Sequence, residues 1–342
     1  MLESFHAQNA DWRQQLKQNE TKTRLIILTF VLIYASIGFI IDTIILQASY
    51  PRVGLEVCFY ALISGQVFPI ATSILLAIAG VSLWITYTLG DRLMLLGTTA
   101  HEITREGPKT HQEQQLINVV EEMKVAAGLQ FMPKVYLINA DYMNAFASGL
   151  SEKSAMVAIT RGLLEKLDRA ELQAVMAHEL SHIRHHDMKV TLTVAVLTNL
   201  MLVVVDMLFY SLFFAKDDRR DNRLLLVVSV LRYVLPLMTL VLALFLNRTR
   251  EFMADAGAVE LTRSNEPMAR ALLKISQDHA QNQNQYVNDY GRTPHEQLRQ
   301  AAYLFDPSAI DPIKSMSTLF STHPSLEARL RALGFKRKIN TV

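Results

Sequence analysis

The sequence predicts a mainly α-helical protein with a small β-sheet that crosses a membrane several times. Half of its 342 residues are hydrophobic, four long apolar segments interrupt the chain, and three short β-rich runs lie together between the second and third of them. The mean hydropathy is positive. A wholly soluble fold is therefore disfavoured.

The charge balance disfavours nucleic acid as a partner. The chain has 34 basic and 32 acidic side chains, and its formal net charge of +2 creates no field that would attract phosphates. The single cysteine, Cys58, lies in an apolar stretch and can form neither an intramolecular disulfide nor a thiolate cluster. A metal site in this chain has to use histidine and carboxylate ligands.

Four apolar segments are long enough to cross a bilayer core of about 30 Å. They cover residues 25–46, 66–89, 190–215 and 224–246. We expect the first to be retained as a signal-anchor. Basic residues in the leader and after the second segment place both flanks of the first hairpin in the cytoplasm. The turn of the second hairpin, 216–223, is also basic, which leaves open whether that hairpin crosses fully.

These segments divide the chain into four parts. Residues 1–90 form a leader and a transmembrane hairpin, 91–187 a first polar block, 188–246 a second apolar hairpin, and 247–342 a second polar block. If the second hairpin crosses twice, both polar blocks lie on the same side of the membrane. They could then build one domain.

Local patterns predict the elements of the first polar block. Thr110 with Glu113 and Asp168 with Glu171 are capping-box patterns, each of which opens an amphipathic helix. Between these helices, β-rich runs predict a small sheet. The runs cover Lys134–Ile138, Ala145–Ser148 and Met156–Thr160.

The second helix carries the strongest chemical signal, His178-Glu179-Leu180-Ser181-His182. Side chains four residues apart share one helix face, so both imidazoles can reach one metal ion with Glu179 beside its water. Zinc suits such ligands, and it would acidify the water while Glu179 takes up the proton and later passes it to the leaving amine. Because an exposed helical turn can contain this pattern by chance, the third ligand matters.

His185 and His186 are unsuitable as the third ligand. In a continuing helix, His186 lies one turn beyond His182, too far to close a compact site with His178. A histidine six residues after His182 is also missing, since that position is Met188. We expect the two extra histidines to be polar residues at the membrane surface.

A carboxylate after the fourth apolar segment is the remaining option. Glu251 and Asp255 lie one helical turn apart. Glu251 could bind the metal while Asp255 accepts a hydrogen bond from the far nitrogen of a ligating histidine. The second hairpin brings Glu251 towards His182, because both residues lie close to its ends.

Two charged residues interrupt the second hairpin at nearly equal depth. Asp206 precedes Lys216 by ten residues, and Arg232 follows Arg223 by nine. Two interpretations are open: an ion pair that fastens the helices together, which we favour because each charge has a partner, and an intramembrane polar site.

At this point four motifs together resemble those of the HtpX-type membrane metalloproteases. They are His178 to His182, Glu251 to Asp255, Asn144 to Gly149, and Thr322-His323-Pro324 with Arg329. The resemblance implies a gluzincin-like zinc peptidase domain, endoproteolysis that depends on one zinc ion per chain, and a role in stress response through quality control of unfolded or damaged membrane proteins. It also implies the bacterial inner membrane, with the peptidase domain in the cytoplasm. The related prenyl-protein processing proteases use the same zinc motifs but have more than four spans.

The resemblance also implies roles for further residues. Asn144, Ala145, Phe146 and Ala147 would form the edge of the substrate cleft, where a peptide adds as an extended strand. His323 and Arg329 would help to hold the tetrahedral intermediate or the site around it. For His323-Pro324 the alternative is a capped helix start.

Two other classes of function stay open. One is a zinc-containing membrane scaffold or chaperone-like binding protein that cleaves nothing, although closed structural zinc sites usually have four protein ligands. The other is a channel or transporter organised around Asp206 and Arg232, which the lack of a visible inverted repeat disfavours.

Overall fold

The structure is a computed structural model that describes residues 5–7, 12–89, 100–104, 107–149, 151–214, 222–283, 285–286, 304 and 323–337. It divides into two compact units. Unit 1 comprises residues 1–23, 89–190 and 244–342, and unit 2 comprises residues 24–88 and 191–243. Each unit is built from segments that are distant in the sequence.

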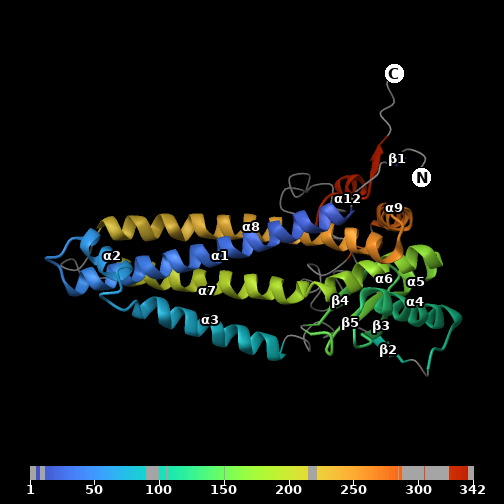
Figure 1. Cartoon of the computed structure of the whole chain (residues 1–342), viewed down its shortest axis with the longest axis horizontal. Coiled ribbons are helices and arrows are strands. Elements are labelled where there is room, and N and C mark those ends of the chain that lie inside the picture. The colour runs from blue at the N-terminus through green and yellow to red at the C-terminus, as the bar shows by residue number, and fades with distance from the viewer. Residues whose placement is uncertain are drawn as a thin grey trace, which may run out of the picture. The chain divides into compact units, whose positions relative to one another are not determined.

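A four-stranded sheet forms part of unit 1 (Figure 1). The three predicted runs are strands β3 (Lys134–Ile138), β4 (Ala145–Ser148) and β5 (Met156–Thr160), and β2 (Ala100–Ile103) was not predicted. The strand order is β2-β3-β5-β4, in which β3 and β5 are parallel and the other two pairs are antiparallel. Within the described chain, β4 is therefore an edge strand.

Side chains alternate between the two faces of this sheet, as the period of a β-strand requires. One face joins the main apolar core with α4 (His111–Ala127), α6 (Arg169–Arg184) and α9 (Glu266–Gln281). The short helix α5 (Arg161–Lys166) connects β5 to α6. The other face is covered in part by Tyr286 and Tyr142. Both faces of the small sheet are thus buried, which fixes its register.

The two predicted helix starts differ in their capping. Asp168 and Glu171 form the full reciprocal capping box at the start of α6. At α4, Thr110 accepts a hydrogen bond from the Glu113 amide, but the Glu113 carboxylate accepts from the amide of Lys109, one residue before the cap. Only half of the first box therefore forms.

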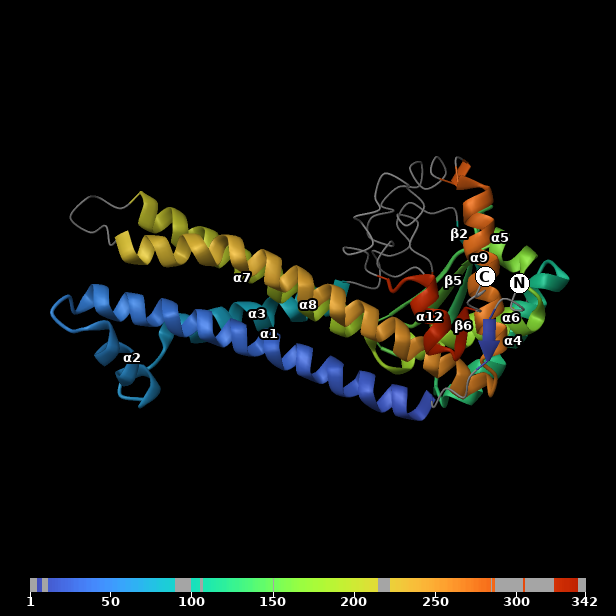
Figure 2. The same cartoon turned by 90° about the horizontal axis from the view of Figure 1, so that it is seen from above.

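The C-terminal part of unit 1 contains α12 (Leu326–Ala332) and β6 (Phe335–Arg337). Strand β6 pairs antiparallel with β1 (Phe5–Ala7), so segments from the two ends of the chain meet. Figure 2 shows α12 and β6 on the side of α9 and α6. This arrangement brings α12 into the same core cluster as α6.

Unit 2 consists mainly of long helices that run lengthwise beside one another (Figures 1 and 2). They are the greater parts of α1 (Trp12–Ser49), α7 (Asp187–Phe213) and α8 (Asn222–Thr262), together with α3 (Ile70–Leu89) and the short α2 (Leu55–Ile63). A small apolar cluster joins α1, α7 and α8, and residues of α3 pack against it. Most of each predicted apolar segment lies in one of these long helices, although α3 begins only at Ile70 and α7 ends at Phe213. Helix α2 was not predicted.

Polar side chains connect the helices of unit 2. Asp42 on α1 is buried and accepts hydrogen bonds from the amides of Ala71 and Thr72 at the start of α3, at 2.7 and 2.9 Å. Asp206 and Arg232 form the predicted ion pair, with 2.6 Å between Oδ1 and Nε. The Arg232 guanidinium also donates a hydrogen bond to the hydroxyl of Tyr210.

Among the described residues, one segment, Leu225–Thr262, is long and apolar enough to cross a membrane by length and composition. Ala35–Ser49 and Met201–Tyr210 are shorter apolar helical stretches. Helix α8 does not end where the predicted span ends at residue 246. It continues to Thr262, and this extension carries Glu251 and Asp255.

Candidate active site

The candidate site lies within unit 1, where α6 meets the C-terminal part of α8. His178 and Glu179 are on α6 and are 0% and 1% exposed. The helices approach closely at Gly257 of α8, because a Cβ atom at that position would lie 2.1 Å from Oγ of Ser181. This close approach allows Glu251, further back on α8, to reach the imidazoles.

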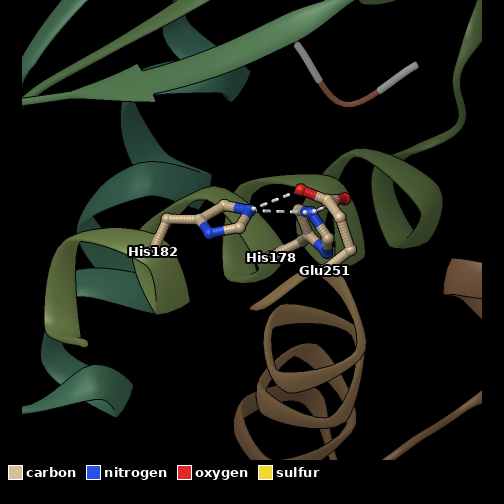
Figure 3. A group of neighbouring side chains, drawn as sticks. All are labelled: His178, His182 and Glu251. Atoms are coloured by element: carbon tan, nitrogen blue, oxygen red, sulfur yellow. Dashed lines mark hydrogen bonds and ion pairs between the residues drawn. The ribbon is translucent and has the colours of Figure 1, made fainter. Parts of the chain in front are cut away.

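Three potential metal ligands converge at this point (Figure 3). Nε2 of His178 and Nε2 of His182 are 3.2 Å apart. Oε2 of Glu251 lies 3.7 Å from the first of these nitrogens, and Oε1 of the same carboxylate lies 3.6 Å from the second. Figure 3 shows both imidazoles coming from α6 and the carboxylate entering from α8.

The spacing of these atoms fits a single zinc ion. Ligands bound tetrahedrally at about 2.0–2.2 Å from zinc stand about 3.3–3.6 Å from each other. The two imidazole nitrogens stand 3.2 Å apart, each has one Glu251 oxygen within 3.7 Å, and one ligand atom from each of the three residues lies within 4.8 Å of the other two. Two imidazole nitrogens and one carboxylate oxygen are also ligand types that zinc accepts.

Each histidine has a carboxylate beside its second ring nitrogen. Nδ1 of His178 lies 3.0 Å from Asp255, and Nδ1 of His182 lies 2.6 Å from Asp187. Asp255 was expected in this role from the sequence, whereas Asp187 was missed. The signal for Asp187 was an acidic residue five positions after His182, where an apolar helix begins.

The surroundings of His178 favour positive charge. Burial lowers the pKa of this imidazole, but the adjacent carboxylates of Asp255 and Glu251 outweigh burial and raise the pKa to about 9. A site that holds a proton so firmly is also suited to a divalent cation, which would take the proton's place on the imidazole.

Glu179 is buried at the centre of the site without a hydrogen-bond partner for either carboxylate oxygen among the described atoms. Burial raises the pKa of this carboxyl group; the charges of His178 and His182 lower it and that of Glu251 raises it, and the net change is upward. A buried carboxylate without partners is costly, so such a group usually serves chemistry. Its oxygens are available to a water molecule or a substrate.

Arg329 and His323 approach the site from the segment around α12. Arg329 donates two hydrogen bonds to Asp255, at 2.8 and 2.6 Å, and its Nη1 lies 3.4 Å from Glu251. His323 Nε2 lies 3.7 Å from the Glu251 carboxylate. Burial lowers the pKa of Arg329, but the charge and hydrogen bonds of Asp255, together with the charges of Glu251 and Glu179, outweigh burial and raise the pKa, so the guanidinium stays charged. Both residues therefore contact groups around the metal position.

The edge strand β4 has one set of main-chain groups that points away from the sheet. The amide of Thr160 on β5 donates to the carbonyl of Asn144, so Asn144 and, two residues on, Phe146 face β5. Ala145 and Ala147 therefore direct their main-chain groups to the open edge. The side chain of Phe146 is fully buried and belongs to the sheet core.

The described chain already occupies one position on this edge. The amide of Leu304 donates a hydrogen bond of 2.9 Å to the carbonyl of Ala145. The side chain of Asn144 is buried and accepts a hydrogen bond from the Ala145 amide. Ala147 is the next residue with outward-facing main-chain groups.

His185 and His186 do not continue α6, contrary to the helix assumed from the sequence. Helix α6 ends at Arg184 with His185 as its C-cap, and His186 has a left-handed backbone with φ of 53°. The chain then turns into α7 at Asp187. Neither histidine belongs to the ligand group, as expected, although the reason is this turn rather than distance along a helix.

Comparisons with known proteins agree on one family. The model of peptidase family M48 matches residues 110–335. The chain is 39% identical over 321 residues to a protease HtpX homolog of Helicobacter acinonychis, covering 93% of this chain and 96% of the relative. It is 32% identical over 329 residues to a protease HtpX homolog of Streptococcus uberis, covering 94% and 98%.

A solved structure is also similar. The crystal structure of S. mikatae Ste24p aligns with a TM-score of 0.44 and 15% identity, covering 94% of this chain and 88% of that chain.

Proposed function

Since this chain belongs to peptidase family M48 and is a metalloprotease that hydrolyses peptide bonds, we propose that it holds one zinc ion on His178, His182 and Glu251. The observation that carries this proposal is the convergence of one ligand atom from each of these residues, all within 4.8 Å of one another. These ligands leave a fourth position for water or substrate, as catalytic zinc sites require.

Glu179 is proposed as the general base. Zinc, when bound, supplies Lewis-acid polarisation of the scissile carbonyl and an acidified water. Glu179 accepts the proton of the attacking water on a carboxylate oxygen that has no competing partner, and then donates it to the leaving amine. Its raised pKa brings the carboxyl group closer to the pH at which it must both accept and release a proton.

Arg329 and His323 are proposed to support this chemistry from the α12 side. Arg329 fixes Asp255 and contacts Glu251, which keeps the third ligand and the partner of His178 in position. The positive guanidinium and the His323 imidazole are also suited to stabilising the negative oxygen of a tetrahedral intermediate.

We propose that substrates bind as extended strands along β4. The carbonyl of Ala145 already accepts a hydrogen bond from Leu304, but Ala147 also directs its main-chain groups to the open edge of the sheet. Such an edge can pair with any peptide backbone. Asn144 and Phe146 hold this strand in place through buried side chains. A site that reads backbone favours unfolded segments, so damaged membrane proteins are the proposed substrates and stress-related quality control the proposed role.

The proposed setting is a bacterial inner membrane with the peptidase domain in the cytoplasm. The first hairpin falls within residues 1–90, the second within 188–246, and the peptidase domain comprises 91–187 and 247–342. Exposed apolar side chains on the helices of unit 2 support four crossings. The orientation can be tested in intact cells with two variants in which Cys58 is replaced and a single new cysteine is introduced, Arg52→Cys or Lys109→Cys. A membrane-impermeant thiol reagent should label the Arg52→Cys variant and not the Lys109→Cys variant. Labelling of the Lys109→Cys variant alone would mean that the orientation is the reverse of the proposed one.

A zinc-containing scaffold or chaperone-like binding protein is the second candidate. It shares the ligands with the proposed enzyme, but it gives Glu179 no task. The exposed face of unit 2 favours membrane attachment equally in both cases. An assay of peptide-bond cleavage distinguishes the two candidates, whereas an assay of substrate binding does not.

The decisive experiment measures casein cleavage by detergent-purified protein, wild type beside Glu179→Gln, with the zinc content of both. We expect equal zinc and cleavage by the wild type alone. His111→Ala is the matched control, because it removes an exposed histidine at the start of α4, outside the ligand group, and should change neither quantity. Cleavage by Glu179→Gln at the wild-type rate would remove the proposed mechanism, and a wild type free of zinc would remove the ligand assignment.

A further inference from the structure

The contact between His182 and Asp187 has no role in the function proposed so far. Nδ1 of His182 and Oδ2 of Asp187 are 2.6 Å apart, a short and charge-assisted hydrogen bond. Asp187 is only 4% exposed. The turn at His185 and His186 brings this carboxylate back onto the imidazole, which a continuous helix could not do.

A second contact connects the same carboxylate to α8. Oδ1 of Asp187 lies 3.1 Å from Nε of Arg250, whose side chain is 12% exposed. Arg250 directly precedes Glu251 in the sequence. One buried carboxylate therefore touches the ring of one ligand and the neighbour of another.

The two histidines are supported in parallel ways. Asp255 lies beside Nδ1 of His178 and is paired with Arg329, while Asp187 lies beside Nδ1 of His182 and is paired with Arg250. In both cases the carboxylate favours the tautomer that carries its proton on Nδ1. The lone pair of each Nε2 then points to the shared metal position.

We propose that Asp187 is a positioning residue of the metal centre. It holds the His182 imidazole in the tautomer and orientation that bind metal, and through Arg250 it ties this ring to the helix that carries Glu251. The inference rests on the proposed function, because it takes His182 and Glu251 as ligands. It goes beyond the ligand assignment, because it states that His182 depends on a carboxylate, Asp187, that is not part of the HExxH motif.

The test uses full-length protein in detergent and measures zinc affinity by competition with a chromophoric chelator. We expect Asp187→Asn, which keeps an acceptor oxygen but loses the charge, to weaken zinc binding by about 10-fold and Asp187→Ala by up to about 100-fold. Arg250→Gln keeps the hydrogen bond to His182 and should give a smaller loss than Asp187→Ala.

Glu260→Gln is the matched control. Glu260 pairs with Arg184 at 3.1 Å and joins α8 to α6, but it contacts no ligand. If Glu260→Gln lost as much zinc affinity as Asp187→Asn, the affinity would depend on the connection between α6 and α8 in general. That outcome would contradict a specific role of Asp187 at His182. We expect Glu260→Gln to bind zinc within about twofold of the wild type, since exposed ion pairs contribute little.

A spectroscopic readout separates positioning from folding. Cobalt replaces zinc in the purified protein, and its visible absorption reports ligand geometry. We expect Asp187→Asn to alter the cobalt bands while Glu260→Gln leaves them unchanged. Wild-type bands and wild-type zinc affinity in both Asp187→Asn and Asp187→Ala would overturn the proposal, whereas a wild-type protein that binds no metal would instead refute the proposed function.

Discussion

Units 1 and 2 have opposite distributions of apolar and polar side chains. In unit 1 the apolar residues form a large buried core around the sheet, and few of the large apolar side chains that the structure describes there are exposed. In unit 2 many large apolar side chains face outwards. They include Leu32, Trp84, Met207, Leu226 and Tyr233, each more than half exposed. Two such surfaces within one chain indicate two different solvents.

Polar groups also serve different purposes in the two units. In unit 1 several of them gather around the candidate metal position, and among the described atoms Glu179 has no hydrogen-bond partner for its carboxylate. In unit 2, Asp42 accepts three hydrogen bonds from residues at the start of α3, and Asp206 pairs with Arg232. The difference suggests that polar groups of unit 1 carry chemistry while those of unit 2 fasten helices. Substitutions can test this division.

The largest effect is expected for Glu251→Ala in unit 1. Loss of a metal ligand should remove zinc and lower kcat/KM for casein by at least about 10³-fold, because the metal contributes several kcal/mol to the barrier. Zinc content and initial cleavage rates measure both changes. Full zinc occupancy with normal activity would contradict the role of this carboxylate.

Arg329→Met tests whether a polar group of unit 1 can both support the chemistry of the site and stabilise the fold. The guanidinium is buried and forms two hydrogen bonds with Asp255, so its loss leaves a buried carboxylate uncompensated. We expect destabilisation of about 3–5 kcal/mol together with loss of zinc affinity. Thermal unfolding and zinc competition measure these effects, with Arg331→Met on the exposed face of α12 as the control.

Asp42→Ala should affect stability without affecting chemistry. The carboxylate caps the first turn of α3, and removal of such a cap costs about 0.5–2 kcal/mol. We expect a lower melting temperature and an unchanged cleavage rate per folded molecule. Glu56→Gln, on the exposed start of α2, is the control. A lower kcat without a lower melting temperature would contradict the conclusion that polar groups of unit 2 only fasten helices.

The smallest effect is expected for Asp206→Asn. Its partner Arg232 keeps the Tyr210 hydrogen bond and the neighbouring aromatic rings, so most of its contacts persist. We expect a smaller drop in melting temperature than for Asp42→Ala, and no change in activity. A strong loss of activity would favour the intramembrane polar site over the fastening ion pair.

Several parts of the fold could be predicted because they follow from local spacing. Helical periodicity brings His178 and His182 onto one face, and the three β-rich runs coincide with strands β3, β4 and β5. The Asp206–Arg232 pair followed from equal depth in a hairpin. Each of these predictions depends on residues that are close in sequence or related by a single turn.

Other features depended on information that periodicity does not contain. Asp187 reaches His182 only because the chain breaks at His186 with a positive φ, and the sequence gives no sign of that break. The contact of Arg329 with Asp255 joins positions 74 residues apart through tertiary packing. Strand β2 and helix α2 were missed because short elements are stabilised mainly by their neighbours.

The close approach of α8 to α6 at Gly257 makes the substitutions allowed at position 257 depend on the residue at position 181. A side chain at 257 would overlap Ser181 and push α8 away from α6, and with it Glu251 from the imidazoles. Metal sites tolerate displacements of only about 0.5 Å. A substitution of Gly257 by a larger residue is therefore tolerated only if Ser181 has first been replaced by glycine. During evolution, the substitution at position 181 must come before the one at position 257.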